Sequence, residues 1–235
     1  MAEGLVPSRA RAADLIRRGC VTVTGAAVLK PGALVADDAP IVVAAGAGDG
    51  VSRGALKLEA ALHDFGFDPV GRVALDIGAS TGGFTEVLLA EGAAKVYAVD
   101  VGRGQLHERL RADPRVVSLE ATDARNLDAA LIPEPVGTIV ADVSFISLTQ
   151  ALPAALKRAA PGSWLVALVK PQFEAGREAV GKGGIVRKAE DRERAVVRVR
   201  DFLEGEGWIV LGVIPSPIEG SSGNVEFLIG ARNAV

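Results

Sequence analysis

Residues Arg72 to Asp100, RVALDIGASTGGFTEVLLAEGAAKVYAVD, decide the fold of this chain of 235 residues. The stretch starts with an apolar run, VALDI, passes through a glycine-rich turn into a helical segment, and ends in a second apolar run, KVYAVD. Buried parallel strands read as continuous apolar runs, and a glycine-rich turn between strand and helix brings a ligand against backbone N–H groups. The stretch therefore predicts a βαβ unit with a ligand site at its first turn.

The same alternation continues after this stretch. Apolar runs at 115–120, 138–145 and 164–171 are separated by longer helical segments, and two further runs, 208–218 and 225–232, flank the turn-rich GSSGN. Strands that alternate with helices predict a parallel sheet, and two closely spaced strands predict an antiparallel pair. We therefore expect an α/β, Rossmann-like domain whose seven-stranded sheet is mostly parallel with one antiparallel strand.

A small α+β module is expected before this domain. Residues 44–50, AAGAGDG, have the composition of a linker. Upstream, residues 8–18 have a serine cap and an apolar stripe typical of a helix, and short β-prone pieces follow it. We divide the chain into a module at 1–45, a linker at 46–52 and the main domain at 53–235.

Composition excludes several classes of protein. Gly, Pro or charged residues interrupt every apolar run, so none approaches the ~20 apolar residues of a membrane helix. The first residues, MAEGLVPSRARAAD, lack the basic start and apolar core of a signal peptide. Cys20, His63 and His107 are the only cysteine and histidines, which predicts neither a disulfide nor a zinc site. We expect a cytoplasmic protein with no metal and no membrane partner.

The glycine-rich turn distinguishes between two cofactors. The dinucleotide fingerprint G-x-G-x-x-G has the same place and also requires an acid about 20 residues later, which Asp100 supplies. Ser80, however, replaces the second fingerprint glycine, where a pyrophosphate needs close approach. Asp76 at the end of the first strand suits an amino group and a sulfonium better than phosphates. The turn therefore predicts S-adenosyl-L-methionine and a methyltransferase rather than a dehydrogenase.

The residues expected to bind this cofactor lie in the glycine-rich turn and at the ends of the strands. They are Asp76, Gly78, Ala79, Ser80, Gly82, Gly83, Phe84, Asp100, Val101, Asp123, Ala124 and Asp142. The role of Asp123, in ATDARNL, has two interpretations: it meets the edge of the adenine, or it caps the turn that follows.

Seven motifs carry a family resemblance. They are VSRGALKLEAAL at 51–62, DIGASTGGF at 76–84, VYAVDVGRGQL at 96–106, ADVSFISL at 141–148, LVKPQFEAGR at 168–177, GKGGIVRK at 181–188 and NVEFLIG at 224–230. Together and in this order they resemble the TlyA family of bacterial ribosomal RNA 2′-O-methyltransferases. The resemblance implies an S4-like RNA-binding module, here shortened at its start, joined to an FtsJ/RrmJ-like methyltransferase domain. It also implies cytidine 2′-hydroxyls of 16S or 23S rRNA as substrate and ribosomal subunits as partners.

The resemblance further implies a catalytic tetrad of Lys57, Asp142, Lys170 and Glu226. Asp142 and Lys170 follow two predicted strands, where open α/β sheets place their ligands. The reaction is an in-line attack by a ribose 2′-oxygen on the sulfonium methyl, so the site must align three atoms and manage one proton. We expect Lys170 to be the general base or the cation that orients the oxygen, with the carboxylates holding the lysines and the ribose.

The cations expected to bind RNA lie mainly before the methyltransferase domain. They are Arg9, Arg11, Arg17, Arg18, Lys30, Arg53, Lys182 and Arg187. The net charge of −3 does not oppose this prediction, because affinity for phosphate depends on local charge. The segment 181–188 is interpreted as a mobile loop near the substrate or as a plain surface loop.

Other functions are weighed against this prediction. A membrane-active haemolysin, the label of some relatives, requires a spanning segment or a strongly amphipathic face, and the sequence has neither. A methyltransferase acting on a non-RNA substrate and a binding module with an inactive site are further alternatives. The complete tetrad argues against the inactive module. We expect a monomer or a weak dimer.

Overall fold

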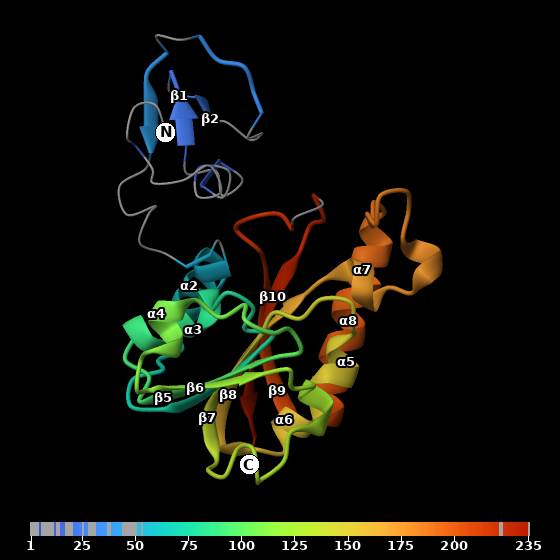
Figure 1. The fold of residues 1–235 in the computed structure, drawn as a ribbon. Coiled ribbons are helices and arrows are strands. Elements are labelled where there is room, and N and C mark those ends of the chain that lie inside the picture. Colours follow the sequence, from blue (N-terminus) through green and yellow to red (C-terminus); the bar gives the residue numbers. More distant parts are fainter. Residues whose placement is uncertain are drawn as a thin grey trace. The chain divides into compact units, whose positions relative to one another are not determined.

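The computed structural model describes residues 5, 12, 15, 16, 21–24, 26, 27, 32–36, 39–43, 51, 52, 54–220 and 223–234. The chain divides into two compact units, Met1–Arg53 and Gly54–Val235. Each unit has its own sheet (Figure 1).

The first unit contains a three-stranded antiparallel sheet of order β2-β1-β3. Its strands are β1 (Val21–Val23), β2 (Ala26–Ala27) and β3 (Ile41–Val43). Each lies in one of the β-prone pieces that the sequence predicts. Of the helix predicted over 8–18, the structure describes Ala12, Leu15 and Ile16, which are helical, and Leu15 is buried.

The second unit is built on a seven-stranded sheet of order β6-β5-β4-β7-β8-β10-β9. The strands are β4 (Val73–Ile77), β5 (Lys95–Asp100), β6 (Val116–Glu120), β7 (Val136–Ala141), β8 (Ala159–Val169), β9 (Trp208–Pro215) and β10 (Phe227–Asn233). The five strands from β6 to β8 are parallel, and β10 runs antiparallel to both β8 and β9. The predicted seven-stranded, mostly parallel sheet with one antiparallel strand is confirmed.

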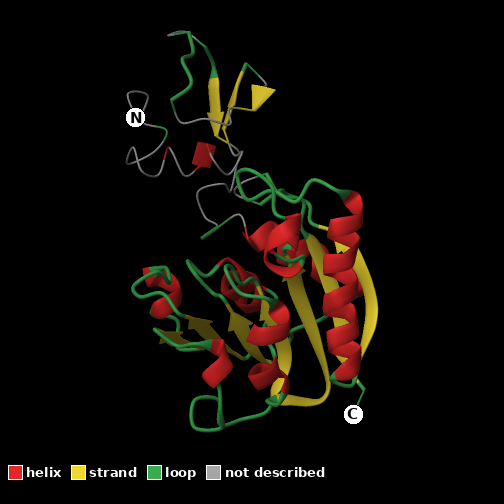
Figure 2. Cartoon of the chain, turned by 90° about the vertical axis from the view of Figure 1, so that its right-hand side faces the viewer, coloured by secondary structure: helices red, strands yellow, loops and turns green. Residues whose placement is uncertain are grey.

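Helices cover both faces of this sheet (Figures 1 and 2). They are α2 (Gly54–Phe65), α3 (Gly83–Ala90), α4 (Glu108–Arg111), η1 (Ala124–Asn126), α5 (Leu148–Ala151), α6 (Pro153–Leu156), α7 (Pro171–Glu174), η2 (Arg177–Ala179) and α8 (Ala189–Gly205). The core on one face joins sheet residues to Leu148, Leu152 and Leu203 of the segment α5 to α8. Burial of each such side chain stabilises the fold by roughly 1.5–3 kcal/mol. None of the described helices has the length and apolarity needed to cross a bilayer.

The order of the strands fixes where a ligand site can form. Strand β4 lies between β5 and β7, so the chain leaves β4 toward one side of the sheet and later returns to its other side. Open α/β sheets bind ligands at such a reversal, outside the carboxyl ends of the strands. The register pairs Ile77 with Val99 on one side and with Ala141 on the other. The residues that follow these three positions are therefore neighbours.

Candidate active site

A cavity of about 590 Å³ opens at the carboxyl ends of β4, β5 and β7. Its volume lies within the range of about 300–1,000 Å³ that is usual for cofactor sites. Seven of the predicted cofactor residues line it: Gly78, Ser80, Asp100, Val101, Asp123, Ala124 and Asp142. Gln105, Thr122, Arg125, Ser144 and Phe145 also contribute to the lining.

The glycine-rich turn is held close to the segment that follows β7. Gly78 N and Ala79 N both donate to the carbonyl of Val99, at 2.9 and 3.1 Å. Gly78 has a φ of +81°, and a Cβ built on it would lie 2.4 Å from the carbonyl oxygen of Asp142. Glycine is required here because both the left-handed backbone and the close approach exclude a side chain. The close approach at this glycine is therefore made by the protein's own backbone.

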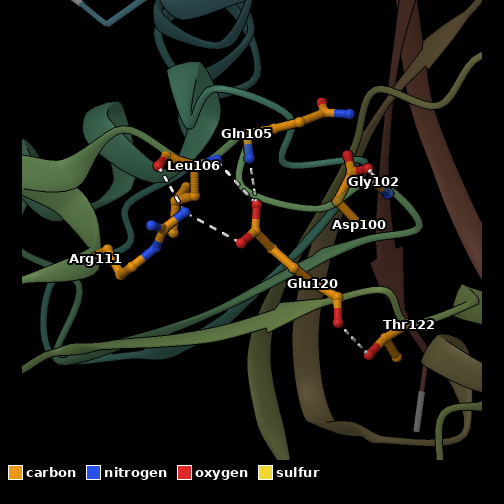
Figure 3. Close-up of polar contacts among 7 residues, drawn as sticks. All are labelled: Asp100, Gly102, Gln105, Leu106, Arg111, Glu120 and Thr122. Carbon is orange, nitrogen blue, oxygen red and sulfur yellow. Dashed lines mark hydrogen bonds and ion pairs between the residues drawn. The ribbon is translucent and has the colours of Figure 1, made fainter.

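Asp100 connects the turn to the end of β5. Its Oδ2 accepts a hydrogen bond from Ser80 N at 2.8 Å. Its Oδ1 accepts one from Gly102 N at 2.7 Å (Figure 3). Ser80 has a φ of +49°, which turns its N–H toward this carboxylate. Each carboxylate oxygen has a second lone pair, so Asp100 can still accept hydrogen bonds from a ligand in the cavity.

Glu120 holds the loop that follows Asp100, and our sequence analysis missed it. Glu120 Oε1 accepts from Gln105 N at 2.6 Å and from Leu106 N at 3.0 Å. Its Oε2 pairs with Arg111 at 3.1 Å, and Arg111 also donates to the Leu106 carbonyl (Figure 3). The hydrogen bond from Leu106 N, with those from neighbouring N–H groups, lowers the pKa of Glu120. The available signal was its position, because Glu120 ends β6 in register with Asp100.

Asp76 is fully buried at the end of β4 rather than exposed in the cavity. Burial raises the pKa of its carboxyl to about 7, while a hydrogen bond from Thr85 Oγ1 at 2.6 Å opposes the shift. Its Oδ1 has no hydrogen-bond partner among the described residues. Four other predicted cofactor residues support the turn without lining the cavity: Ala79, Gly82, Gly83 and Phe84.

Asp123 has features of both interpretations that the sequence left open. It caps η1, because its Oδ1 accepts from Arg125 N at 2.9 Å, and it also lines the cavity. The Arg125 guanidinium donates to both carboxylate oxygens and lowers the pKa of Asp123. The carboxylate is therefore ionised and fixed at the wall of the cavity.

The four residues of the predicted tetrad form two ion pairs. Lys57 Nζ lies 2.7 Å from Glu226 Oε2, with both side chains at most 9% exposed. Lys170 Nζ lies 2.6 Å from Asp142 Oδ1 and donates to Ser144 Oγ at 2.9 Å.

The topology brings these two pairs to one edge of the sheet. Asp142 follows β7, Lys170 follows β8, and Glu226 precedes the antiparallel β10. These three strands are adjacent in the sheet, and Phe227 pairs with Val169. The site can therefore hold two lysines, each restrained by a carboxylate, beside the wall of the cavity.

Phe145 is a second residue that sequence reasoning missed. Its side chain is 91% exposed, although it lines the cavity. Its φ of +68° is a strained conformation for a bulky residue. Its ring contacts that of Phe173, with centroids 5.3 Å apart. The sequence gives no signal for this backbone conformation.

Of the cations predicted to bind RNA, the structure describes Lys182 and Arg187, and both are exposed. The other six lie outside the described residues: Arg9, Arg11, Arg17, Arg18, Lys30 and Arg53. The loop at 181–188 that carries the two described cations is anchored in its middle, where Val186 is buried.

Comparison with known proteins places the chain among methyltransferases. Residues 50–233 match the family model of FtsJ-like methyltransferases. The chain is 48% identical over 230 residues to the 16S/23S rRNA (cytidine-2′-O)-methyltransferase TlyA of Mycobacterium tuberculosis, covering 97% of this chain and 86% of that protein. It is also 42% identical to Hemolysin A of Brachyspira hyodysenteriae, covering 96% of this chain and 94% of that protein.

Solved structures agree with this placement. A relative from Streptococcus thermophilus, 42% identical, superposes with a TM-score of 0.79 over 99% of this chain and 85% of its own. The N-methyltransferase NodS of Bradyrhizobium japonicum, solved in complex with S-adenosyl-L-homocysteine, is 21% identical. It superposes with a TM-score of 0.53 over 76% of this chain and 84% of its own, and so shares the fold.

Proposed function

Because the chain belongs to the FtsJ-like methyltransferase family, we propose that it transfers a methyl group from S-adenosyl-L-methionine to a ribose 2′-hydroxyl of ribosomal RNA. The TlyA relative's name supports cytidine in 16S or 23S rRNA as the acceptor. The observation that carries the proposal is the position of Asp142, which lines the cavity and is also paired with Lys170. The cavity proposed for the methyl donor and the Lys170–Asp142 ion pair thus share one residue, Asp142.

The cavity fits the proposed cofactor in size and in charge. Asp100 has free lone pairs for ribose hydroxyls, and Asp123 with Ala124 forms a wall for the adenine. The carboxylates of Asp100, Asp123 and Asp142 favour a ligand that carries positive charge. The buried, unpartnered Oδ1 of Asp76 also favours a ligand that brings donors to this end of β4. The cofactor would supply an electrophilic methyl group on its sulfonium.

The lysine pairs support a hydroxyl acceptor. Lys170 Nζ is restrained by Asp142 and Ser144, so its position beside the cavity is fixed before the acceptor arrives. From there it orients the 2′-oxygen for in-line attack or takes its proton. Positioning of this kind can lower a barrier by about 7–11 kcal/mol. The Lys57–Glu226 pair, formed between α2 and the residue before β10, would hold the ribose.

An exposed aromatic supports RNA as the acceptor class. Single-stranded bases stack on aromatic side chains, at about 1–3 kcal/mol per base. The ring of Phe145 is exposed at the cavity, in the same segment as Asp142 and Ser144, and offers such a surface. A base flanking the reacting ribose could therefore stack beside the lysine that faces its hydroxyl.

The deciding experiment compares acceptors directly. The purified protein is incubated with methyl-labelled cofactor and with ribosomal subunits, free ribosomal RNA, a protein mixture or a metabolite extract. We expect label in ribosomal RNA, located at ribose 2′-oxygens by mapping of the modified nucleotides. Label confined to protein or metabolites would overturn the RNA acceptor, and label on a base would overturn the 2′-hydroxyl.

A further inference from the structure

Asn224 fastens the basic loop at 181–188 to the segment that leads into β10. Its Oδ1 accepts from Val186 N at 3.0 Å, and its Nδ2 donates to the Gly184 carbonyl at 2.8 Å. Asn224 is only 2% exposed, and its own carbonyl accepts from Gly220 N at 3.0 Å. A buried amide whose donor and acceptor both engage one loop fixes that loop in place, because an unmade bond would leave a buried polar group without a partner.

The same segment carries one member of the tetrad. Asn224 and Glu226 are both buried, while Val225 between them is partly exposed. Asn224 holds the loop, and Glu226, two residues later, reaches Lys57 at 2.7 Å. The loop and the Lys57–Glu226 pair are therefore tied to one short piece of backbone.

The loop that Asn224 holds carries positive charge. Lys182, Arg187 and Lys188 are exposed, and none of them forms an ion pair with another described residue. Gly181 N donates to the Ile185 carbonyl and Gly184 N to the Gly181 carbonyl, so the loop turns back on itself between Lys182 and Arg187. Exposed lysines and arginines bind the phosphates of RNA regardless of sequence.

We propose that Asn224 is a positioning residue for the RNA acceptor. It keeps Lys182 and Arg187 at a fixed offset from Glu226, so that phosphates bound by the loop bring a ribose hydroxyl to the Lys57–Glu226 pair. The inference rests on the proposed function. The physical reason for this role is the precision that the reaction requires. A misplacement of the reacting atoms by about 1 Å can lower the rate about 100-fold, and phosphate contacts from a loop that is not held in place would not prevent such a misplacement.

The test is Asn224→Ala in the full chain, assayed with ribosomal RNA and labelled cofactor. We expect kcat/KM for RNA to fall about tenfold or more, with the Kd of the cofactor unchanged within about twofold. The slope of log affinity for RNA against log salt should become shallower by roughly 0.7–0.9 for each cation that no longer reaches a phosphate. A purely structural role would not change this slope.

A matched control and a coupled variant complete the design. Asn233→Ala removes the same side chain at the other end of β10, where Asn233 Nδ2 donates to the Ala160 carbonyl at 3.2 Å, and should leave kcat/KM unchanged within about twofold. In a Lys182→Ala, Arg187→Ala background, Asn224→Ala should add little further loss, because the clamp acts through these cations.

Two outcomes would overturn the inference. One is an unchanged salt slope in Asn224→Ala, whether or not activity falls; the other is a loss of activity that adds fully to that of the cation variants. If Asn224→Ala does not fold, Asn224→Asp replaces it: it keeps an acceptor for Val186 N, and it replaces the donor to Gly184 by a carboxylate oxygen that brings a negative charge. A wild-type protein that labels no RNA would instead refute the proposed function.

Discussion

Lys170 and Asp142 are joined by an ion pair of 2.6 Å between the ends of two neighbouring strands. Asp142 is the only one of the two that lines the cavity, so the lysine meets the cofactor site through its carboxylate partner. In the proposed function, the ion pair thus divides two tasks, contact with the cofactor and contact with the acceptor, between two side chains. In that function, the carboxylate contributes to the cofactor site and the ammonium group acts on the acceptor.

Removal of this ammonium group should abolish transfer and spare cofactor binding. Lys170→Ala is expected to lower the single-turnover rate by about 10²–10⁴-fold, the range typical of general acid–base groups. The Kd of the cofactor, measured by calorimetry, should stay within a few-fold. Lys157→Ala, an exposed lysine at the end of α6, serves as the control. Equal loss of binding and rate would point to a structural role for Lys170.

Breaking the other pair should destabilise the fold. Glu226→Gln leaves the buried Lys57 ammonium without its counter-charge, and loss of one partner of a buried pair typically costs about 3–5 kcal/mol. The double variant Lys57→Met, Glu226→Leu should recover most of the free energy of unfolding but not the activity. Urea unfolding and the methyl-transfer assay measure the two effects separately. An active double variant would contradict the assignment of this pair to the site.

Glu120 should control cofactor affinity without touching the cofactor. Glu120→Gln weakens the contacts to Gln105 N, Leu106 N and Arg111, so the loop after Asp100 loses its anchor. We expect the Kd of the cofactor to rise about tenfold, which corresponds to about 1.4 kcal/mol. Asp113→Asn is the matched control, because Asp113 also accepts a backbone bond and pairs with an arginine, beyond the opposite end of β6. Equal effects of the two variants would show a general loss of stability instead.

The strained backbone at Phe145 predicts opposite changes in stability and activity. Asparagine tolerates the left-handed conformation, which costs other residues roughly 1–2 kcal/mol, while the ring pair with Phe173 that the substitution removes is worth about 0.5–1.5 kcal/mol. Phe145→Asn should therefore leave the free energy of unfolding nearly unchanged or slightly higher. The KM for RNA should rise by about 5-fold to 100-fold, as expected when a base loses its stacking partner. An unchanged KM for RNA would exclude a contact between this ring and the acceptor.

The buried carboxyl of Asp76 should make stability depend on pH. Its pKa is raised from 3.8 to about 7, so the folded protein binds a proton that the unfolded chain releases between these values. The protonated carboxyl of Asp76 therefore contributes fully to the free energy of unfolding below about pH 4. This contribution falls by about 1.4 kcal/mol per pH unit as pH rises, and it is lost once pH has passed through 7. Urea unfolding from pH 5 to 8 should show wild type losing stability relative to Asp76→Asn. Parallel curves would contradict the raised pKa.

The sequence predicted those features of the structure that depend on local patterns of residues, namely the strands and the positions of their ends. Apolar runs located the strands, and the rule that parallel strands end at one edge placed Asp142 and Lys170 together. Lys57 and Glu226 are 169 positions apart, so their place in one tetrad followed from family resemblance, and their pairing was seen only in the structure. The anchoring by Glu120 could not be read from sequence either, because it depends on how a later loop folds back over the end of β6.

The contact of Gly78 with the carbonyl of Asp142 has a consequence for redesign of the enzyme. A single added methyl group, as in Gly78→Ala, would need the space that the backbone before Val143 already fills, and so would displace the segment that carries the acceptor machinery. The wall of the proposed methyl-donor site and the segment proposed to present the acceptor are one piece of structure. Efforts to admit other cofactors should therefore leave Gly78 and Asp142 unchanged.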